Sequence, residues 1–193
     1  DLHRVPRRQR QMCIRDSLQI LIFFWKIIVL FPRKIQLFFG NCIGYLFLLS
    51  KNKRNRFSKV NINLCFPDLD TNSAYRIYKK NIILFGRVIF DTGIAWFWSD
   101  DRINKNIPYK INGLELLLRY QRLNNGVLLF FKHSLHLELD SRILAMNAEI
   151  FGVERKHNST YFESIQKNGR LKSMKGVAAV SYTHLTLPTM DSV

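Results

Sequence analysis

The sequence predicts an α/β protein: a parallel sheet with flanking helices, preceded by an N-terminal membrane helix. Residues 127–131 (V-L-L-F-F) form an unbroken apolar run, which suits a strand buried on both faces. Residues 149–155 suit a second short strand, and a helical pattern follows each strand, as in a β-α-β-α chain with a parallel sheet. Two apolar runs, at residues 18–31 and 35–49, account for the predicted membrane helix.

The two ends of the chain differ from the rest. Residues 1–17 and 180–193 resemble translated read-through of sequencing adapters, and we expect both to be artefacts outside the fold. The alternative for residues 1–17 is a basic arm beside a membrane, which their five arginines would suit. On the first interpretation, the chain is a fragment with both ends missing.

The chain is strongly basic, with 30 Lys and Arg against 14 Asp and Glu and a formal net charge of +16. The two suspect ends hold five of the arginines and three of the aspartates, so the basic excess belongs to the rest of the chain. This excess predicts an anionic partner: nucleic acid, a membrane surface or an acidic protein. Since zinc-finger spacing, aromatic RNA-binding motifs and basic heptad helices are all lacking, the sequence favours lipid over nucleic acid.

The apolar runs at residues 18–31 and 35–49 are separated by Pro32, and each is shorter than the roughly 20 residues of a membrane-spanning helix. We expect residues 18–50 to be a membrane anchor followed by a helix at the membrane interface; the alternative is a pair of core or interfacial helices. Residues 51–59 (K-N-K-R-N-R-F-S-K) are the densest basic run. Beside a membrane segment, such a run indicates a cytoplasmic surface that binds anionic headgroups, with about 1 kcal/mol for each Lys or Arg. Alternatively, it is a solvated basic face.

A helix is predicted after Pro67, where Thr71 or Ser73 can cap a start near Ala74. Its apolar residues recur three or four apart, in a stripe that we expect to face the core: Tyr75, Tyr78, Ile82, Phe85 and Ile89. The aromatic residues 96–98 suit either the core or a lipid-facing patch, and the pattern leaves both open. An Asn-Gly turn at residues 112–113 precedes a short amphipathic helix.

The strongest candidate site lies where the first strand would end, at His133. A helix is predicted just beyond it, from the spacing of Leu135, Leu139, Ile143 and Met146. Because ligands of open α/β sheets bind outside the carboxyl ends of the strands, His133 would lie at such an edge. Glu138, in the first helical turn, could fold back onto one imidazole nitrogen and leave the other for a substrate proton. The pair predicts a general base, although a histidine and a glutamate also fall this close by chance.

Other reaction classes lack their motifs. The sequence has no G-x-S-x-G, no P-loop, no dinucleotide fingerprint and no metal-ligand cluster. Cys42 and Cys65 belong to neither a C-x-x-C pair nor a metal spacing, which suits a reducing compartment. Without an evident nucleophile a covalent intermediate is not supported, and we expect neither a cofactor nor a metal.

Several stretches together resemble the lipid A biosynthesis lauroyl/myristoyl acyltransferases, a Kdo-dependent branch of the glycerolipid acyltransferase superfamily. They are residues 63–67 (N-L-C-F-P), 91–98 (D-T-G-I-A-W-F-W), 133–138 with H-x-x-x-x-E spacing, and 169–170 (G-R). The resemblance covers residues 18–176, and the string at 91–98 is its most specific part. It implies a glycerolipid-acyltransferase-like fold, in which residues 51–179 are the N-terminal part of a truncated acyltransferase domain.

The resemblance implies O-acyl transfer in lipopolysaccharide biosynthesis of a Gram-negative bacterium. An acyl-(acyl carrier protein) would donate the fatty acyl group, and a hydroxyl of a Kdo-lipid A precursor would accept it. The family's single N-terminal membrane helix implies the inner membrane, with the active site on the cytoplasmic side. Arg170 matches an arginine that the family needs for activity, and Arg155 a basic position after the second strand; both would contact phosphate. His136 is interpreted as a first-turn helical residue and His157 as a loop residue.

Two alternatives stay open at this point. One is a glycerolipid or lysophospholipid acyltransferase of the same superfamily, although the string at residues 91–98 favours the lipid A branch. The other is a non-catalytic basic protein that binds membrane surfaces or nucleic acid. Its binding would collapse with added salt and would not depend on His133.

Overall fold

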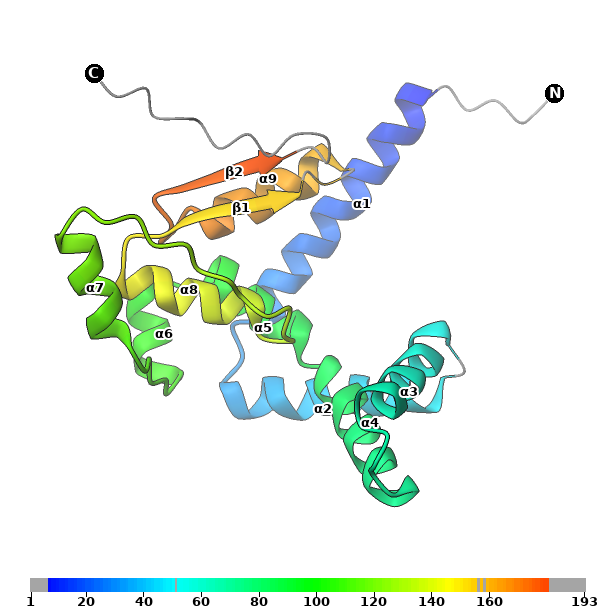
Figure 1. Ribbon diagram of the computed structural model, residues 1–193. Helices are drawn as coiled ribbons and strands as arrows, with labels where there is room; N and C mark the ends of the chain where they lie inside the picture. The colour runs from blue at the N-terminus through cyan, green and yellow to red at the C-terminus, as the bar shows by residue number, and fades with distance from the viewer. Residues whose placement is uncertain (1–6, 51, 156, 158, 181–193) are drawn as a thin grey trace. The chain divides into compact units, whose positions relative to one another are not determined.

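The computed structural model describes residues 7–50, 52–155, 157 and 159–180 (Figure 1). This part of the chain is mostly helical and contains a small parallel sheet of two strands. The elements, in order, are α1 (Arg7–Ile28), α2 (Arg33–Leu49), α3 (Lys53–Cys65), α4 (Thr71–Phe85), α5 (Val88–Phe97), α6 (Asp100–Asn106), α7 (Leu114–Arg122), α8 (Leu137–Asn147), β1 (Phe151–Arg155), α9 (Thr160–Arg170) and β2 (Gly176–Val180).

The chain divides into two compact units. The helical unit comprises Leu21–Ile107 and Phe131–Leu139. The strand unit comprises Asp1–Ile20, Pro108–Phe130 and Asp140–Val193. Helices α1 and α8 each contribute residues to both units.

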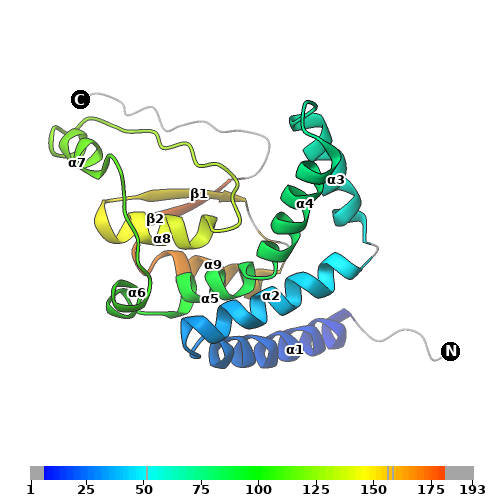
Figure 2. The ribbon, with the colours of Figure 1, turned by 90° about the horizontal axis from the view of Figure 1, so that it is seen from below.

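The core of the helical unit forms where α2 meets α4 and α5, while α3 and α4 lie side by side (Figure 2). Ile82, Ile94 and Ile103 are its fully buried isoleucines. Gly44 of α2 lies so close to α4 that a Cβ at this position would overlap the backbone of Ile83. The close crossing of the two helices therefore requires a glycine.

The helix predicted after Pro67 is α4, and its cap is Asp70 rather than Thr71 or Ser73. The Asp70 carboxylate accepts hydrogen bonds from the backbone N–H groups of Asn72 (2.9 Å) and Ser73 (3.0 Å). These bonds satisfy two of the four amide groups that a helix start leaves without partners. The helix consequently begins at Thr71, earlier than the sequence predicted.

The apolar stripe predicted for this helix faces the core only in part. Tyr78 and Ile82 are buried, whereas Tyr75 is 52% exposed. Ile89 lies in α5 instead, because α4 ends before it, and its side chain is exposed. The buried part of the stripe has a chemical consequence, since burial raises the pKa of the Tyr78 hydroxyl.

The tryptophans of the D-T-G-I-A-W-F-W string belong to the core, which decides between the two alternatives for them. Trp96 and Trp98 are buried, and Trp98 Nε1 donates a hydrogen bond to the carbonyl oxygen of Val29 at 2.8 Å. The ring of Trp25 packs edge-on against Trp96, with centroids 5.5 Å apart. Buried indole N–H groups normally find such partners, so these residues fix α5 against the N-terminal segment.

The predicted N-terminal membrane helix is not supported. Among the described residues, no helix is both long enough and apolar enough to cross a membrane. The apolar run of α1 is preceded by Arg15 and Asp16 and interrupted by Lys26, while α2 has only 17 residues. Gln36 of α2 is also buried, and its amide donates hydrogen bonds that close the turn between the two helices.

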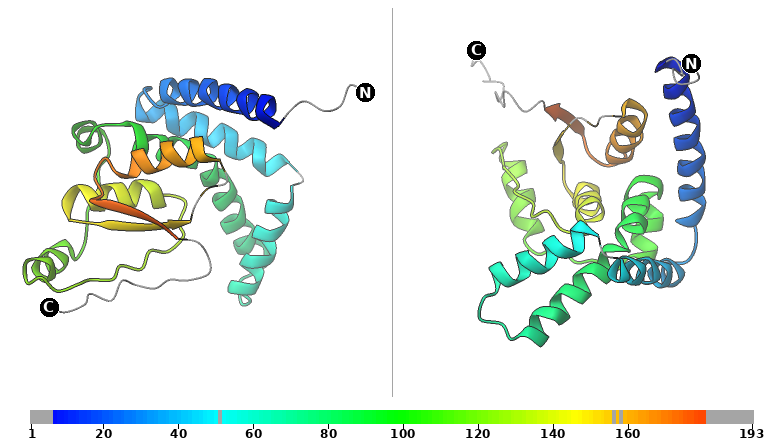
Figure 3. Two further views of the ribbon diagram at one scale, coloured as in Figure 1. Left: turned by 90° about the horizontal axis from the view of Figure 1, so that it is seen from above. Right: turned by 90° about the vertical axis from the view of Figure 1, so that its right-hand side faces the viewer.

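The strand unit contains the predicted β-α-β arrangement. Strands β1 and β2 pair in parallel, from Phe151 opposite Gly176 to Arg155 opposite Val180, and α9 connects them (Figure 3). Ser159 caps α9, since its hydroxyl accepts the N–H of Phe162. The predicted turn at residues 112–113 and the helix after it are confirmed as the start of α7.

The central strand predicted at residues 127–131 was wrong. In the described part of the chain these residues are extended but form no strand, and β1 pairs with β2 alone. Leu128 is 76% exposed and Phe130 is 89% exposed. An apolar run becomes a buried strand only where neighbouring strands accept its backbone hydrogen bonds and helices cover its faces. The parallel sheet is therefore confirmed only in a reduced, two-stranded form.

Candidate active site

His133 lies in the exposed, extended segment that leads into α8. The helix predicted after it is confirmed and begins at Leu137. The backbone between them is a turn, in which Ser134 N–H donates to the carbonyl oxygen of Lys132 at 2.9 Å. Across the described residues, the His133 imidazole makes no hydrogen bond or ion pair. The structure thus presents this histidine on a surface, without a side-chain partner that orients it.

Glu138 lies in the first turn of α8, as predicted, and its carboxylate contacts the D-T-G-I-A-W-F-W string. Trp96 Nε1 donates a hydrogen bond to Glu138 Oε2 at 2.8 Å. The contact joins residues 42 positions apart in the chain, and the donor is a buried ring that cannot easily move. One oxygen of Glu138 is therefore held in place from α5.

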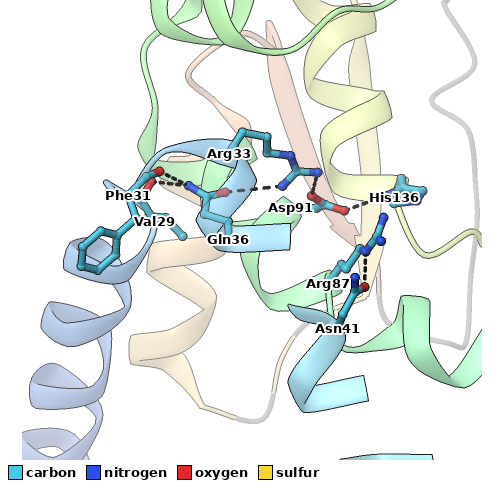
Figure 4. Close-up of polar contacts among 8 residues, drawn as sticks. All are labelled: Val29, Phe31, Arg33, Gln36, Asn41, Arg87, Asp91 and His136. Atoms are coloured by element: carbon cyan, nitrogen blue, oxygen red, sulfur yellow. Dashed lines mark hydrogen bonds and ion pairs between the residues drawn. The ribbon is translucent and has the colours of Figure 1, made fainter. Parts of the chain in front are cut away.

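A buried carboxylate, Asp91, forms the polar centre of the helical unit (Figure 4). Its side chain is 1% exposed. His136 Nδ1 lies 2.7 Å from Asp91 Oδ2, and Arg33 Nη2 lies 2.5 Å from Oδ1. The arginine is not aligned as a hydrogen-bond donor, so its attraction for Oδ1 is that of an ion pair. Asp91 thereby links the start of α2, helix α5 and the turn before α8.

Further polar contacts hold this centre from the side of α2 (Figure 4). Arg33 Nη1 donates to Gln36 Oε1 at 3.4 Å, and Gln36 Nε2 donates to the carbonyl oxygens of Val29 and Phe31, each at 2.8 Å. A buried carboxylate is costly unless it is paired with a positive charge, and the arginine itself is held by these bonds. The arrangement leaves Asp91 few other orientations.

Arg170 and Arg155 belong to the strand unit. Arg170 is the last residue of α9, and its Nη1 forms an ion pair with Glu154 Oε2. The two side chains are 17% and 7% exposed, so this is a largely buried pair rather than the surface salt bridge that a lone arginine suggests. Arg155 ends β1, as predicted, and lies opposite Val180; its side chain is outside the described residues.

The cysteines and residues 63–67 are not part of these polar contacts. Cys42 and Cys65 are free and exposed, and the described residues contain no cluster of three side chains that could hold a metal ion. Residues 63–67, one of the family-like stretches, contribute Asn63, Phe66 and Pro67 to a surface pocket of about 390 Å³ between α3 and α4. This stretch therefore shapes a different surface from the turn that carries His133.

Sequence reasoning missed the partnership of Arg33, Asp91 and His136. His136 was interpreted as an ordinary residue of the first helical turn, yet it is the turn's link to Asp91. One signal was present in the sequence: Asp91 is the single charge in an otherwise apolar and aromatic string. A carboxylate in such a run must be buried with a cationic partner or left at an edge.

Comparison with known proteins now decides the family. The profile of the bacterial lipid A biosynthesis acyltransferase family matches residues 7–182. The chain belongs to this family. The match includes parts of both ends that the sequence set apart, residues 7–17 and 180–182, and the boundaries drawn there stay predictions.

Individual relatives agree with the family. A lipid A biosynthesis acyltransferase of Haemophilus influenzae is 35% identical over 156 residues, which cover 80% of this chain and 49% of the relative. In Escherichia coli K12, a lipid A biosynthesis palmitoleoyltransferase is 29% identical (81% of this chain, 50% of the relative) and a lauroyltransferase is 30% identical (78% and 49%). The chain spans about half the length of the curated relatives it matches. No solved structure matches it significantly.

Proposed function

We propose that the protein carrying this chain is an acyltransferase of lipid A biosynthesis. It would move a fatty acyl group from an acyl-(acyl carrier protein) to a hydroxyl of a Kdo-lipid A precursor. The observation that carries the proposal is family membership over residues 7–182, together with the H-x-x-x-x-E spacing from His133 to Glu138 inside the match. The relatives named for palmitoleoyl and lauroyl transfer support a fatty acyl group as the transferred unit.

His133 is the proposed general base. Its imidazole takes the proton of the acceptor hydroxyl, and the oxygen attacks the thioester carbonyl of the donor. The new ester bond forms as the C–S bond breaks, and the departing thiolate takes up a proton, so that no covalent acyl-enzyme is needed. The exposure of His133 supports this role, because a base must reach a substrate that is held outside the fold.

Glu138 is the proposed orienting group for His133. An ionised carboxylate has about four lone-pair sites, so Glu138 can accept several hydrogen bonds at once, from Trp96 Nε1 and from an imidazole N–H. Catalytic hydrogen bonds are often long in the absence of substrate and tighten in the complex. The bond between His133 and Glu138 would accordingly form when substrate closes the segment before α8.

Arg170 and Arg155 are proposed to contact phosphate, either on the lipid precursor or on the carrier's phosphopantetheine. A guanidinium has five N–H donors in a planar fork that matches phosphate geometry, and Arg170 is held beside Glu154 by their ion pair. The pair would then aim the arginine. Arg155 lies at the carboxyl end of β1, the edge at which ligands of parallel sheets bind.

The inner membrane, with the active site on its cytoplasmic side, is the proposed location. Large apolar side chains are exposed along α1 and α2, among them Phe23, Phe24, Phe38 and Phe39. Helix α3 then presents exposed basic residues, including Arg54 and Lys59. Apolar and basic surfaces in succession suit an interfacial attachment to anionic lipid.

The test is an acyl-transfer assay on the complete reading frame that carries this chain. The purified protein is supplied with acyl-(acyl carrier protein) and a Kdo-lipid A precursor, and the product is measured by mass spectrometry; glycerol 3-phosphate and a lysophospholipid serve as competing acceptors. We expect His133→Ala to lower turnover at least about 100-fold and to leave membrane attachment unchanged. His157→Ala is the matched control, since His157 is an exposed loop histidine. Retained turnover in His133→Ala, or transfer only to the competing acceptors, would contradict the proposal.

A further inference from the structure

Helix α5 contacts the turn before α8 at one point and the first turn of α8 at another. Asp91, near the start of the helix, contacts His136 Nδ1 at 2.7 Å, and Trp96, near its end, donates to Glu138 at 2.8 Å. The two donor–acceptor pairs join positions separated by 45 and 42 residues in the chain. Both residues of α5 are buried, and both partners are partly exposed. Helix α5 therefore contacts His136 at the end of the turn and Glu138 at the start of α8.

The Asp91 contact is the more strongly determined of the two. Arg33 pairs with one carboxylate oxygen, which leaves the other oxygen for His136 (Figure 4). The positive charge of Arg33 offsets the cost of burying the Asp91 carboxylate, so the side chain can stay at 1% exposure. The contact with the other carboxylate oxygen then holds the His136 ring in one orientation, in the manner by which buried carboxylates orient imidazoles in other sites.

The segment on the other side of His136 carries His133. Residues 127–134 lie outside the sheet, and the His133 side chain makes no hydrogen bond or ion pair within the part of the chain that the structure describes. Only two residues lie between His133 and His136. The position of the His133 backbone is consequently set by the residues that follow it, where the turn is attached to α5.

We propose that His136 and Asp91 are positioning residues for the acyl transfer, holding the turn so that His133 and Glu138 can meet over the substrate. This inference rests on the proposed function, since it assigns the base to His133. Arg33 serves the same end by fixing Asp91. The D-T-G-I-A-W-F-W string then has a mechanical role: Asp91 holds His136 at the end of the turn, and Trp96 holds Glu138 at the start of α8.

Substitutions at His136 separate this role from direct contact with substrate. In asparagine, Nδ2 can replace imidazole Nδ1 as the donor to Asp91, whereas in glutamine Nε2 can replace the outer nitrogen. We expect His136→Ala in the complete protein to lower kcat about 10- to 100-fold, with KM changed less than about twofold. His136→Asn should recover most of the loss and His136→Gln little of it.

The opposite pattern overturns the inference. Recovery by glutamine but not asparagine would mean that the outer nitrogen of His136 touches substrate. Unchanged kcat in His136→Ala would mean that the turn needs no such attachment. Should the alanine variant fail to fold, the asparagine and glutamine variants still decide between the two roles, provided that their thermal unfolding midpoints match the parent.

A double-mutant cycle supplies the second test. If Asp91 acts through His136, then Asp91→Ala and His136→Ala together should lower kcat no further than the more damaging single variant. Additive losses would show that the two residues act separately and would overturn the inference. His133→Ala, measured alongside, keeps the proposed function distinct: if that variant retains turnover, the proposed base is wrong, whatever the result at His136.

Discussion

The two units each bury one carboxylate among the described residues, and each carboxylate is paired with an arginine. Asp91 on α5 pairs with Arg33, and Glu154 on β1 pairs with Arg170. Asp91 uses its second oxygen to hold His136, whereas the Glu154 pair ties the end of α9 back to β1. The two paired carboxylates therefore have different structural roles. Asp91 connects the core of its unit to a surface turn, whereas Glu154 connects β1 to the neighbouring helix α9.

The units also differ in how much apolar surface they bury. Ile94, in the helical unit, is completely buried, and Trp96 and Trp98 beside it are nearly so. In the strand unit, β1 leaves Phe151 73% exposed and Val153 65% exposed. A two-stranded sheet with α9 beside it leaves part of its apolar surface exposed. We therefore expect the ion pair between Arg170 and Glu154 to contribute a larger share of the stability of this unit.

Arg170→Ala should give the largest loss of stability. The substitution leaves the Glu154 carboxylate buried without its counter-ion, which costs about 3–5 kcal/mol. Chemical denaturation of the complete protein measures the change, and Glu154→Gln added to Arg170→Ala should restore most of it. If the double variant is stable but inactive, Arg170 also contacts substrate. A loss below about 1 kcal/mol would mean that the pair behaves as a surface salt bridge.

Ile94→Ala should follow closely, and it tests the difference in packing between the units. Removing the buried side chain leaves a cavity in the core of the helical unit and should lower the free energy of unfolding by about 3 kcal/mol. Val153→Ala in β1 is the matched control and should change stability by less than about 0.5 kcal/mol, because the side chain is exposed. Equal losses of stability at the two positions would contradict the difference in packing between the units.

The smallest effect concerns the helix caps of the two units, Asp70 for α4 and Ser159 for α9. The side-chain and backbone hydrogen bonds from Ser73 lower the pKa of the Asp70 carboxyl below its ordinary value of 3.8, and Arg76 adds to this. Since the folded-state pKa is lowered, the charge stabilises the fold above pH 3.8, and this contribution disappears as the pH falls through the folded-state pKa.

Asp70→Asn keeps a capping oxygen and removes the charge, so it isolates this contribution. The parent should have the higher thermal unfolding midpoint at pH 7, and the two midpoints should converge as the pH is lowered below 3.8. Ser159→Ala in α9 should lower the midpoint by an amount that does not change over this range, because a hydroxyl does not titrate there. A constant difference for Asp70→Asn would contradict the assignment.

Much of the local structure could be predicted from the sequence. The helical periodicity after His133, the turn at residues 112–113 and the strand that ends at Arg155 all depend on neighbours within a few positions, and all three are confirmed. The family could also be predicted, because the string at residues 91–98 is specific even in a single sequence. The roles of His133 and Glu138 came from the same resemblance and stay proposals.

What the sequence could not decide was which distant residues meet. Residues 127–131 and 88–97 are both rich in apolar side chains. Most of the second stretch is buried against other helices, whereas the first stretch is exposed. The partnership of Arg33, Asp91 and His136 spans more than 100 positions; the lone charge of Asp91 is visible in the sequence, but no local pattern identifies its partners. Local propensity set the helices and turns of this protein. Burial and charge pairing depend on the neighbours that the fold supplies, so only the tertiary structure could place an orienting carboxylate behind His136.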